Sequence, residues 1–175
     1  MKRVLTAAFG LAVLMAITLP LQAATPRGKT EITLKGKTVS VEYGRPSLHG
    51  RTIQQILAMK SETGNFWRLG ADASTTFATG VPLAFGSKTV PAGTYSLWAE
   101  MLPHSKWELV FNTQHGQYGT THNPKLDLVK VPLRETKAGD SADTVTIKLM
   151  KHGMDSGNFA VQWGDLVLEA NFKAR

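Results

Sequence analysis

Five side chains in or beside two connecting segments, 44–50 and 61–73, have types suited to binding an anion. They are Tyr43, Arg45, Arg51, Trp67 and Arg68. Guanidinium groups next to aromatic faces suit a carboxylate, sulfate, phosphate or sugar acid, because they combine bidentate hydrogen bonds with stacking. The alternative is structural: an arginine pairs with Glu42 or Asp72 and ties a loop to a sheet. The five residues are therefore a candidate ligand-binding cluster.

The histidines do not show the spacing of a metal or catalytic site. They are His49, His104, His115, His122 and His152. Imidazole is the commonest metal ligand and general base, but a site needs several converging groups. Neither an HxH nor an HExxH spacing occurs, so we expect all five at the surface and expect neither a metal nor another cofactor.

Other catalytic groups are equally unsupported by the sequence. It contains no cysteine and no G-x-S-x-G segment, so no nucleophile stands out. The acids considered for paired-carboxylate chemistry stand singly, at Glu42, Glu62, Asp72, Glu100 and Glu108. We assign no catalytic residue, and the chain is more readily a binding protein than an enzyme.

Four large aromatic side chains, Tyr95, Trp98, Trp107 and Trp163, allow a sugar-stacking platform or a packed core. Core packing is the favoured interpretation, since strands alternate faces and these residues carry much apolar area. Trp98 is the exception, because it points to the face opposite Tyr95.

The elements that position these residues are predicted to be strands. Apolar residues recur with period two in many short runs, which is typical of strands with one buried face. Clear runs are 95–101, 107–111, 129–133, 145–149 and 159–163. One short helix is predicted, capped by Thr52 and ending near Met59. The expected fold is mainly β, an antiparallel β-sandwich or flattened barrel of about ten strands with one short helix.

Glycine-containing dipeptides predict tight hairpin turns at Lys35-Gly36, Gly86-Ser87 and Gly164-Asp165. Residues 90–93 fit a type I turn. The longer connections 44–50, 61–73 and 112–125 are where function is expected, since binding residues on β scaffolds gather in loops.

The first residues have the three parts of a secretory leader. Lys2 and Arg3 precede the apolar run 4–19, and the small residues Ala23 and Ala24 follow. The run is shorter than the roughly 20 residues that cross a bilayer. We therefore expect residues 1–23 to be a cleaved signal peptide and 24–175 to be one β-rich domain, with cleavage after Ala23 or Ala24.

Composition limits the remaining classes. With no cysteine there is neither a disulfide nor a lipid attachment site, so we expect a soluble periplasmic or secreted protein without a membrane anchor. The formal net charge is +7, of which Lys2 and Arg3 leave with the leader. The other lysines are scattered, so nucleic-acid binding is not expected.

Several motifs resemble one known family when taken in order. They are VEYGRPSLHGRTI, FWRLGADASTTF, KTVPAGTYSLWAE, HGQYG and DLVKV. Together they resemble the bacterial family labelled domain of unknown function 2911, over about residues 29–172. The resemblance implies an exported single-domain β-rich protein and no established activity, substrate or cofactor.

Three functions stay open on the sequence alone. The first is a binding module for an unknown small anionic or sugar-like ligand at the arginine and aromatic cluster. The second is a structural or partner-binding protein of the cell envelope, whose partner is another envelope protein. The third is a hydrolase or lyase acting on an envelope polymer, with His49 or His115 as base.

Overall fold

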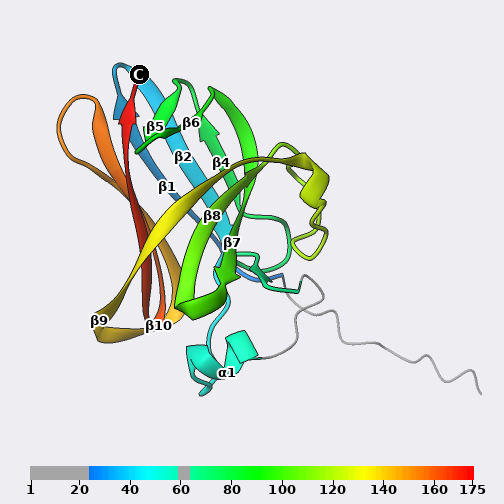
Figure 1. Ribbon diagram of the computed structural model, residues 1–175. Helices are drawn as coiled ribbons and strands as arrows, with labels where there is room; N and C mark the ends of the chain where they lie inside the picture. The colour runs from blue at the N-terminus through cyan, green and yellow to red at the C-terminus, as the bar shows by residue number, and fades with distance from the viewer. Residues whose placement is uncertain (1–23, 59–63) are drawn as a thin grey trace, which may run out of the picture.

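Ten antiparallel strands form one continuous sheet in the computed structural model, which describes residues 24–58 and 64–175 (Figure 1). The elements in chain order are β1 (Arg27–Leu34), β2 (Lys37–Gly44), α1 (Ile53–Ala58), β3 (Phe66–Trp67), β4 (Thr76–Thr79), β5 (Leu83–Phe85), β6 (Lys88–Val90), β7 (Gly93–Leu102), β8 (Lys106–Asn112), β9 (Asp127–Lys151) and β10 (Ser156–Ala174). Single 3-10 turns, η1 (Pro103–Ser105) and η2 (Pro124–Leu126), precede β8 and β9. The expected leader, Met59 and Glu62 lie outside the described residues.

The strand order is β1-β2-β4-β7-β8-β9-β10-β5-β6, with β3 added beside β7. The sheet is not closed, since β1 and β6 form its two ends. The expectation of a mainly β, antiparallel fold with one short α-helix is confirmed.

Two long, bent elements turn the sheet back over itself. The first residues of β9 pair with β8, whereas its later residues pair with β10. β10 folds back on itself near Gly164, so that its two ends meet. Asn158 Nδ2 donates to Asn171 Oδ1, and Ala174 N donates to Asp155 O, just before the strand begins. Figure 1 shows the resulting layers, with the orange and red strands facing the blue and green ones.

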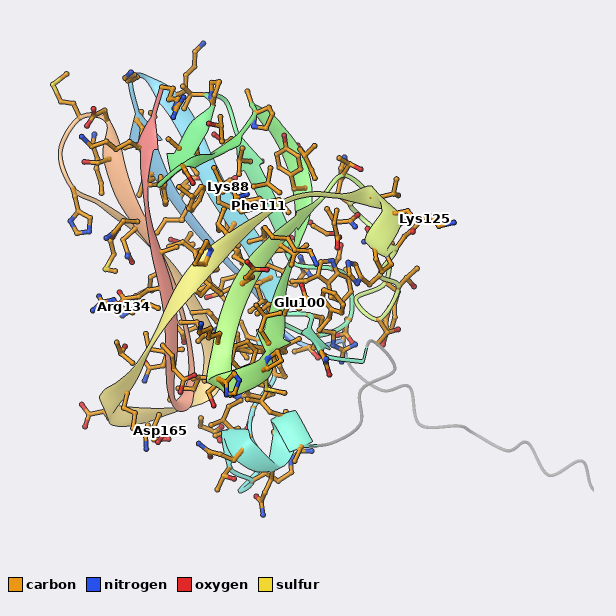
Figure 2. All side chains as sticks on the ribbon, viewed as in Figure 1. Lys88, Glu100, Phe111, Lys125, Arg134 and Asp165 are labelled. Atoms are coloured by element: carbon orange, nitrogen blue, oxygen red, sulfur yellow. The ribbon has the colours of Figure 1, made fainter. Side chains whose placement is uncertain are left out.

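The core lies between these layers. Inward positions alternate with more exposed ones along most of β2, as the period of two predicts. The last four residues of β8 are instead all buried, so both faces of this strand are covered there. Phe111 sits at the centre and makes edge contacts with Phe77 and Tyr95, while Lys125 and Arg134 point outward (Figure 2). Burying such an aromatic side chain stabilises the fold by roughly 1.5–3 kcal/mol.

Two of the three predicted hairpin turns, Lys35-Gly36 and Gly86-Ser87, occur where they were expected. The third, at Gly164-Asp165, does not separate two strands, because both residues lie inside β10, where this element folds back and its register with β9 shifts. Leu34 pairs with Lys37 across Lys35 and Gly36, whose φ angles are 47° and 73°. Positive φ at both central residues matches the twist of the flanking strands, which is why a glycine is found there.

The helix α1 starts with a capping box. Gln55 N donates to Thr52 Oγ1, and Thr52 N donates in return to Gln55 Oε1. Ile53 is buried, and its side chain packs against Gly164 at the turn of β10. α1 therefore lies across one end of the sheet (Figure 1).

Within residues 24–58 and 64–175, none of the helices has the length and apolar character that spanning a membrane requires.

Candidate functional site

A pocket of about 410 Å³ lies between α1 and the nearby end of the sheet. Its walls come from the 45–52 connection, α1, β3 with the residues on either side of it, the ends of β7 and β8, and the middle of β10. A volume of this size is within the range of about 300–1,000 Å³ typical of small-molecule sites.

Three of the four tryptophans line this pocket. Trp67 and Trp163 stack, with ring centroids 5.9 Å apart and planes 17° from parallel. Trp107 is the third, and all three are nearly buried. They offer the flat apolar surface on which a sugar ring or an aromatic ring packs.

The indole N–H groups differ in their partners. Trp163 Nε1 donates to Asp143 O at 3.0 Å, and Trp107 Nε1 donates to Glu135 Oε2 at 2.8 Å. Trp67 Nε1 is buried without an acceptor in the described part of the chain. A buried N–H left in this state costs about 1–3 kcal/mol, so an acceptor from a ligand or water would be stabilising there.

Three basic side chains, His49, Arg51 and Arg68, reach the same pocket. Arg51 Nε donates to Leu48 O at 3.0 Å, and Arg68 Nε donates to Gly70 O at 3.1 Å. These bonds fix each guanidinium at one nitrogen. None of the pocket-lining residues among 24–58 and 64–175 is acidic.

Backbone conformation explains how Arg68 is placed. Leu69 and Asp72 have φ angles of 56° and 58°, so the chain turns tightly around Gly70. A Cβ atom on Gly70 would lie 3.0 Å from Gly44 O, which shows how closely this turn packs on the end of β2. Leu69 is fully buried, and Arg68 is directed to the pocket from the other side of the turn.

The 45–52 connection is held by the middle of β9. Leu48 N donates to Asp143 O, and Val145 N donates to Pro46 O. Ser47 Oγ also donates to Asp143 Oδ2 at 2.5 Å. This connection therefore forms a fixed wall of the pocket and not a free loop.

The structure brings Arg51, Trp67 and Arg68 of the predicted cluster together in the pocket, and places the other two elsewhere. Tyr43 is 4% exposed, and its hydroxyl donates to Ile147 O at 3.3 Å. Arg45 is exposed, and its Nε donates to Val145 O at 3.5 Å. Both side chains pack over Gly28, outside the lining of the pocket.

Sequence reasoning weighed Trp107 and Trp163 as part of a sugar-stacking platform but favoured core packing, because their period-two spacing indicates a core face, and so left them out of the candidate cluster. Both do belong to the core cluster, and both also line the pocket. Trp107 lies near the start of β8, and Trp163 precedes Gly164, where the pairing of β10 with β9 is irregular.

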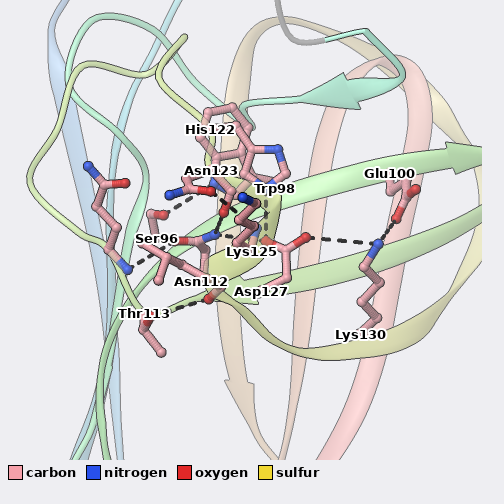
Figure 3. Close-up of polar contacts among 12 residues, drawn as sticks. Ser96, Trp98, Glu100, Asn112, Thr113, His122, Asn123, Lys125, Asp127 and Lys130 are labelled. Carbon is pink, nitrogen blue, oxygen red and sulfur yellow. Dashed lines mark hydrogen bonds and ion pairs between the residues drawn. The ribbon is translucent and has the colours of Figure 1, made fainter.

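A second polar cluster lies on the outer face of β7 and β8, beneath the 113–126 connection (Figure 3). His122 Nε2 is 2.8 Å from Asp127 Oδ1, and the two side chains are only 4% and 7% exposed. The prediction that all five histidines lie at the surface is therefore wrong for His122. Its ring packs between Trp98 and Phe66, with centroid distances of 4.7 and 4.2 Å. The Asp127 carboxylate gives the buried imidazole a polar partner.

Further polar contacts tie this cluster to the strands. Asn112 Nδ2 donates to Asp127 Oδ1 at 2.8 Å. Lys130 Nζ donates to Glu100 Oε2 at 2.6 Å and lies 3.9 Å from Asp127 Oδ2. The hydrogen bond to Glu100 raises the pKa of Lys130 above its usual value. The cluster fastens the 113–126 connection, which supplies Thr120 to the pocket wall.

The two sites do not combine into an obvious catalytic centre. A hydrolase or lyase was expected to bring a histidine, an acid and an arginine into one cleft. The described pocket residues supply His49 and the arginines without an acid, whereas the pair His122 and Asp127 is buried in the other cluster. The described residues also contain no group of three or more histidine, cysteine or acidic side chains placed to hold a metal ion.

Comparison with known proteins gives one match. No curated protein and no solved structure is similar enough to this chain to count as a match. The family model described as "Protein of unknown function (DUF2911)" matches residues 25–172, which is most of the chain. The resemblance drawn from the sequence motifs is thereby confirmed, and the chain belongs to the DUF2911 family.

Proposed function

We propose that this protein is a binding module whose pocket takes a small ligand with a ring and a negatively charged group, of which a sugar acid is the simplest example. The observation that carries the proposal is the meeting of three indoles and three basic side chains in one pocket, with no acid among the described lining residues.

The aromatic side of the pocket supports a ring-shaped ligand. The stacked pair Trp67 and Trp163 is held in place by core contacts, so little side-chain freedom is lost on binding. Ile56, Leu57 and Met101 add flexible apolar surface around the indoles. Such a lining favours the apolar face of a pyranose or an aromatic ring over a bare inorganic ion.

The basic side supports the negative charge. Arg68 is half-buried, and its Nη groups make no hydrogen bond to the described part of the chain, so they are available to a ligand. A guanidinium presents parallel donors that match a carboxylate, and partial burial reduces screening by water.

Glucuronate, with neutral glucose for comparison, tests this proposal. Titration is followed by tryptophan fluorescence, since three of the four indoles line the pocket. We expect glucuronate to change the emission saturably and glucose to bind at least tenfold more weakly, because it lacks the charge recognised by the arginines.

Arg68→Gln and Arg45→Gln form a matched pair of variants. Both remove one positive charge from the same region, but only Arg68 lines the pocket. We expect Arg68→Gln to weaken glucuronate binding about tenfold or more and Arg45→Gln to leave it nearly unchanged. Equal binding of glucose and glucuronate, or equal losses in the two variants, would contradict an anion site at Arg68.

The second part of the proposal is that the chain is exported to the periplasm or beyond. Its support is the basic start, the apolar run 4–19 and the small residues at 23 and 24, together with a family match that begins at residue 25. Recovery of a shortened chain from the periplasmic fraction or the medium, measured by intact mass, tests this part.

A further inference from the structure

The backbone at Thr25 is bound to a carboxylate. Thr25 N donates to Asp72 Oδ2 at 2.7 Å, a contact between residues 47 positions apart. The next residue is fixed as well, since Arg45 N donates to Pro26 O at 2.8 Å. Among residues 24–58 and 64–175, Thr25 is thus the first with a hydrogen bond, and Ala24 before it is exposed.

Asp72 is well placed to hold a positive charge. It has a left-handed backbone with φ of 58°, which aspartate and asparagine tolerate better than most residues. Its own carbonyl accepts from Gly119 N at 2.6 Å, so it also joins two connections of the pocket region. The hydrogen bond from Thr25 is the largest cause that lowers the pKa of Asp72, and Arg68 and Arg27 lower it further.

We infer that removal of residues 1–24 converts the Thr25 nitrogen into a charged α-amino group that forms an ion pair with the Asp72 carboxylate. Water adds across the Ala24–Thr25 peptide bond in this step. The carbonyl carbon of Ala24 takes the hydroxyl and leaves as a carboxylate, and the Thr25 nitrogen takes protons to become an ammonium. A leader-removing peptidase of the export machinery supplies the catalysis.

The geometry distinguishes this cleavage position from its neighbour. Cleavage after Ala24 places the new charge on the atom that already lies 2.7 Å from Asp72 Oδ2. Cleavage after Ala23 leaves Thr25 N as a neutral amide and puts the amino group one residue away. The inference rests on the proposed export, but the ion pair itself is tested without it.

The first experiment is the intact mass of the protein recovered from the periplasmic fraction or the medium. A mass equal to residues 25–175 supports the inference. A chain that starts at any other residue in that fraction overturns it while leaving export in place. A chain that retains Met1 and stays in the cytoplasm contradicts export itself.

The second experiment is a double-mutant cycle on residues 25–175, which contain every described strand. One form has a free amino group at Thr25, and the other is acetylated there, which keeps the N–H and removes the charge. Each form is made with Asp72 and with Asp72→Asn, because asparagine keeps an acceptor and tolerates the left-handed backbone.

We expect the free amino group to raise Tm by about 1–3 °C at pH 7 when Asp72 is present and to have no effect with Asp72→Asn. The gain should disappear at alkaline pH, as the amine loses its proton, whose ordinary pKa is about 7.7–8.0. It should also disappear in acid, since the lowered pKa of Asp72 provides stability that is lost as pH falls through that value. A gain that is absent, or equal in both Asp72 backgrounds, overturns the ion pair.

Discussion

At the scale of single residues, the pocket depends on small residues as much as on the large ones that line it. Arg68 reaches the pocket because the turn around Gly70 packs against the backbone of Gly44. The basic and aromatic types of Arg51, Trp67 and Arg68 were enough to predict them as candidate ligand-binding residues. The sequence pattern contains no information on the close backbone contacts that place them.

Gly44→Ala tests this contact. A Cβ atom at Gly44 would lie 2.2 Å from Ala71 O and 2.8 Å from Ala71 N, and backbone atoms cannot move aside as a flexible side chain can. We expect the free energy of unfolding in urea to fall by about 1–3 kcal/mol or more. Gly139→Ala is the matched control, because nothing lies within 4 Å of its Cβ position. Equal stability of the two variants would contradict the close packing.

Tyr43 and Arg45 show why a cluster in sequence was only partly a cluster in space. Their partners Ile147 and Val145 follow them by 104 and 100 positions. The sequence indicates that β2 and β9 exist, but the closeness of their ends follows from the bend in β9. Tyr43 and Arg45, which precede Arg51 by only a few residues, therefore contact β9 and not the pocket.

At the scale of elements, the 113–126 connection is a fixed covering of the outer face of β7 and β8. Trp98 was predicted to point away from the core, and the structure buries it completely beneath this connection. An outward tryptophan is a signal that something covers it, although the sequence did not identify His122 as the cover. His122 covers Trp98 because its ring packs on the indole while Asp127 pairs with its Nε2.

His122→Ala tests the role of this contact. The variant removes the ring between Trp98 and Phe66 and takes one hydrogen-bond partner from the nearly buried Asp127. We expect a loss of about 1–3 kcal/mol in unfolding free energy. Faster hydrogen exchange is also expected at Gly119 N, whose bond to Asp72 O joins the two connections.

The control for this variant is His115→Ala, in the same connection but exposed. It should change unfolding free energy by less than about 0.5 kcal/mol. If the two histidine variants behave alike, the buried pair does not fasten the connection.

At the scale of the whole molecule, hydrophobic alternation and turn residues predicted the class of fold correctly, because both act locally. Strand order could not be predicted in this way. The path from β8 through β9 to β10 and then back to β5 depends on two bent elements, and the period-two pattern within each part is the same whether the chain bends or continues. The pocket is formed at the end of the sheet by parts that this path brings together.

Two groups with raised pKa values, one in the core and one on the outer face, lower the free energy of unfolding at alkaline pH. Tyr95 is 5% exposed, its hydroxyl donates to Pro91 O at 3.0 Å, and burial raises its pKa. The pKa of Lys130 is also raised, first by its hydrogen bond to Glu100. A group with a raised folded-state pKa contributes stability below its unfolded pKa, which is about 10 for both types, and loses that contribution as pH rises through the folded value.

We therefore expect the free energy of unfolding in urea to decline from about pH 9 to about pH 11. Tyr95→Phe should be less stable by about 1 kcal/mol near pH 8, because the bond to Pro91 is lost, yet should decline less steeply, since the buried phenol is gone. Tyr118→Phe is the matched control at an exposed position and should keep the wild-type slope. If Tyr95→Phe declines as steeply as the wild type, the alkaline loss arises elsewhere, and Lys130→Met becomes the variant that decides whether the outer-face cluster is its source.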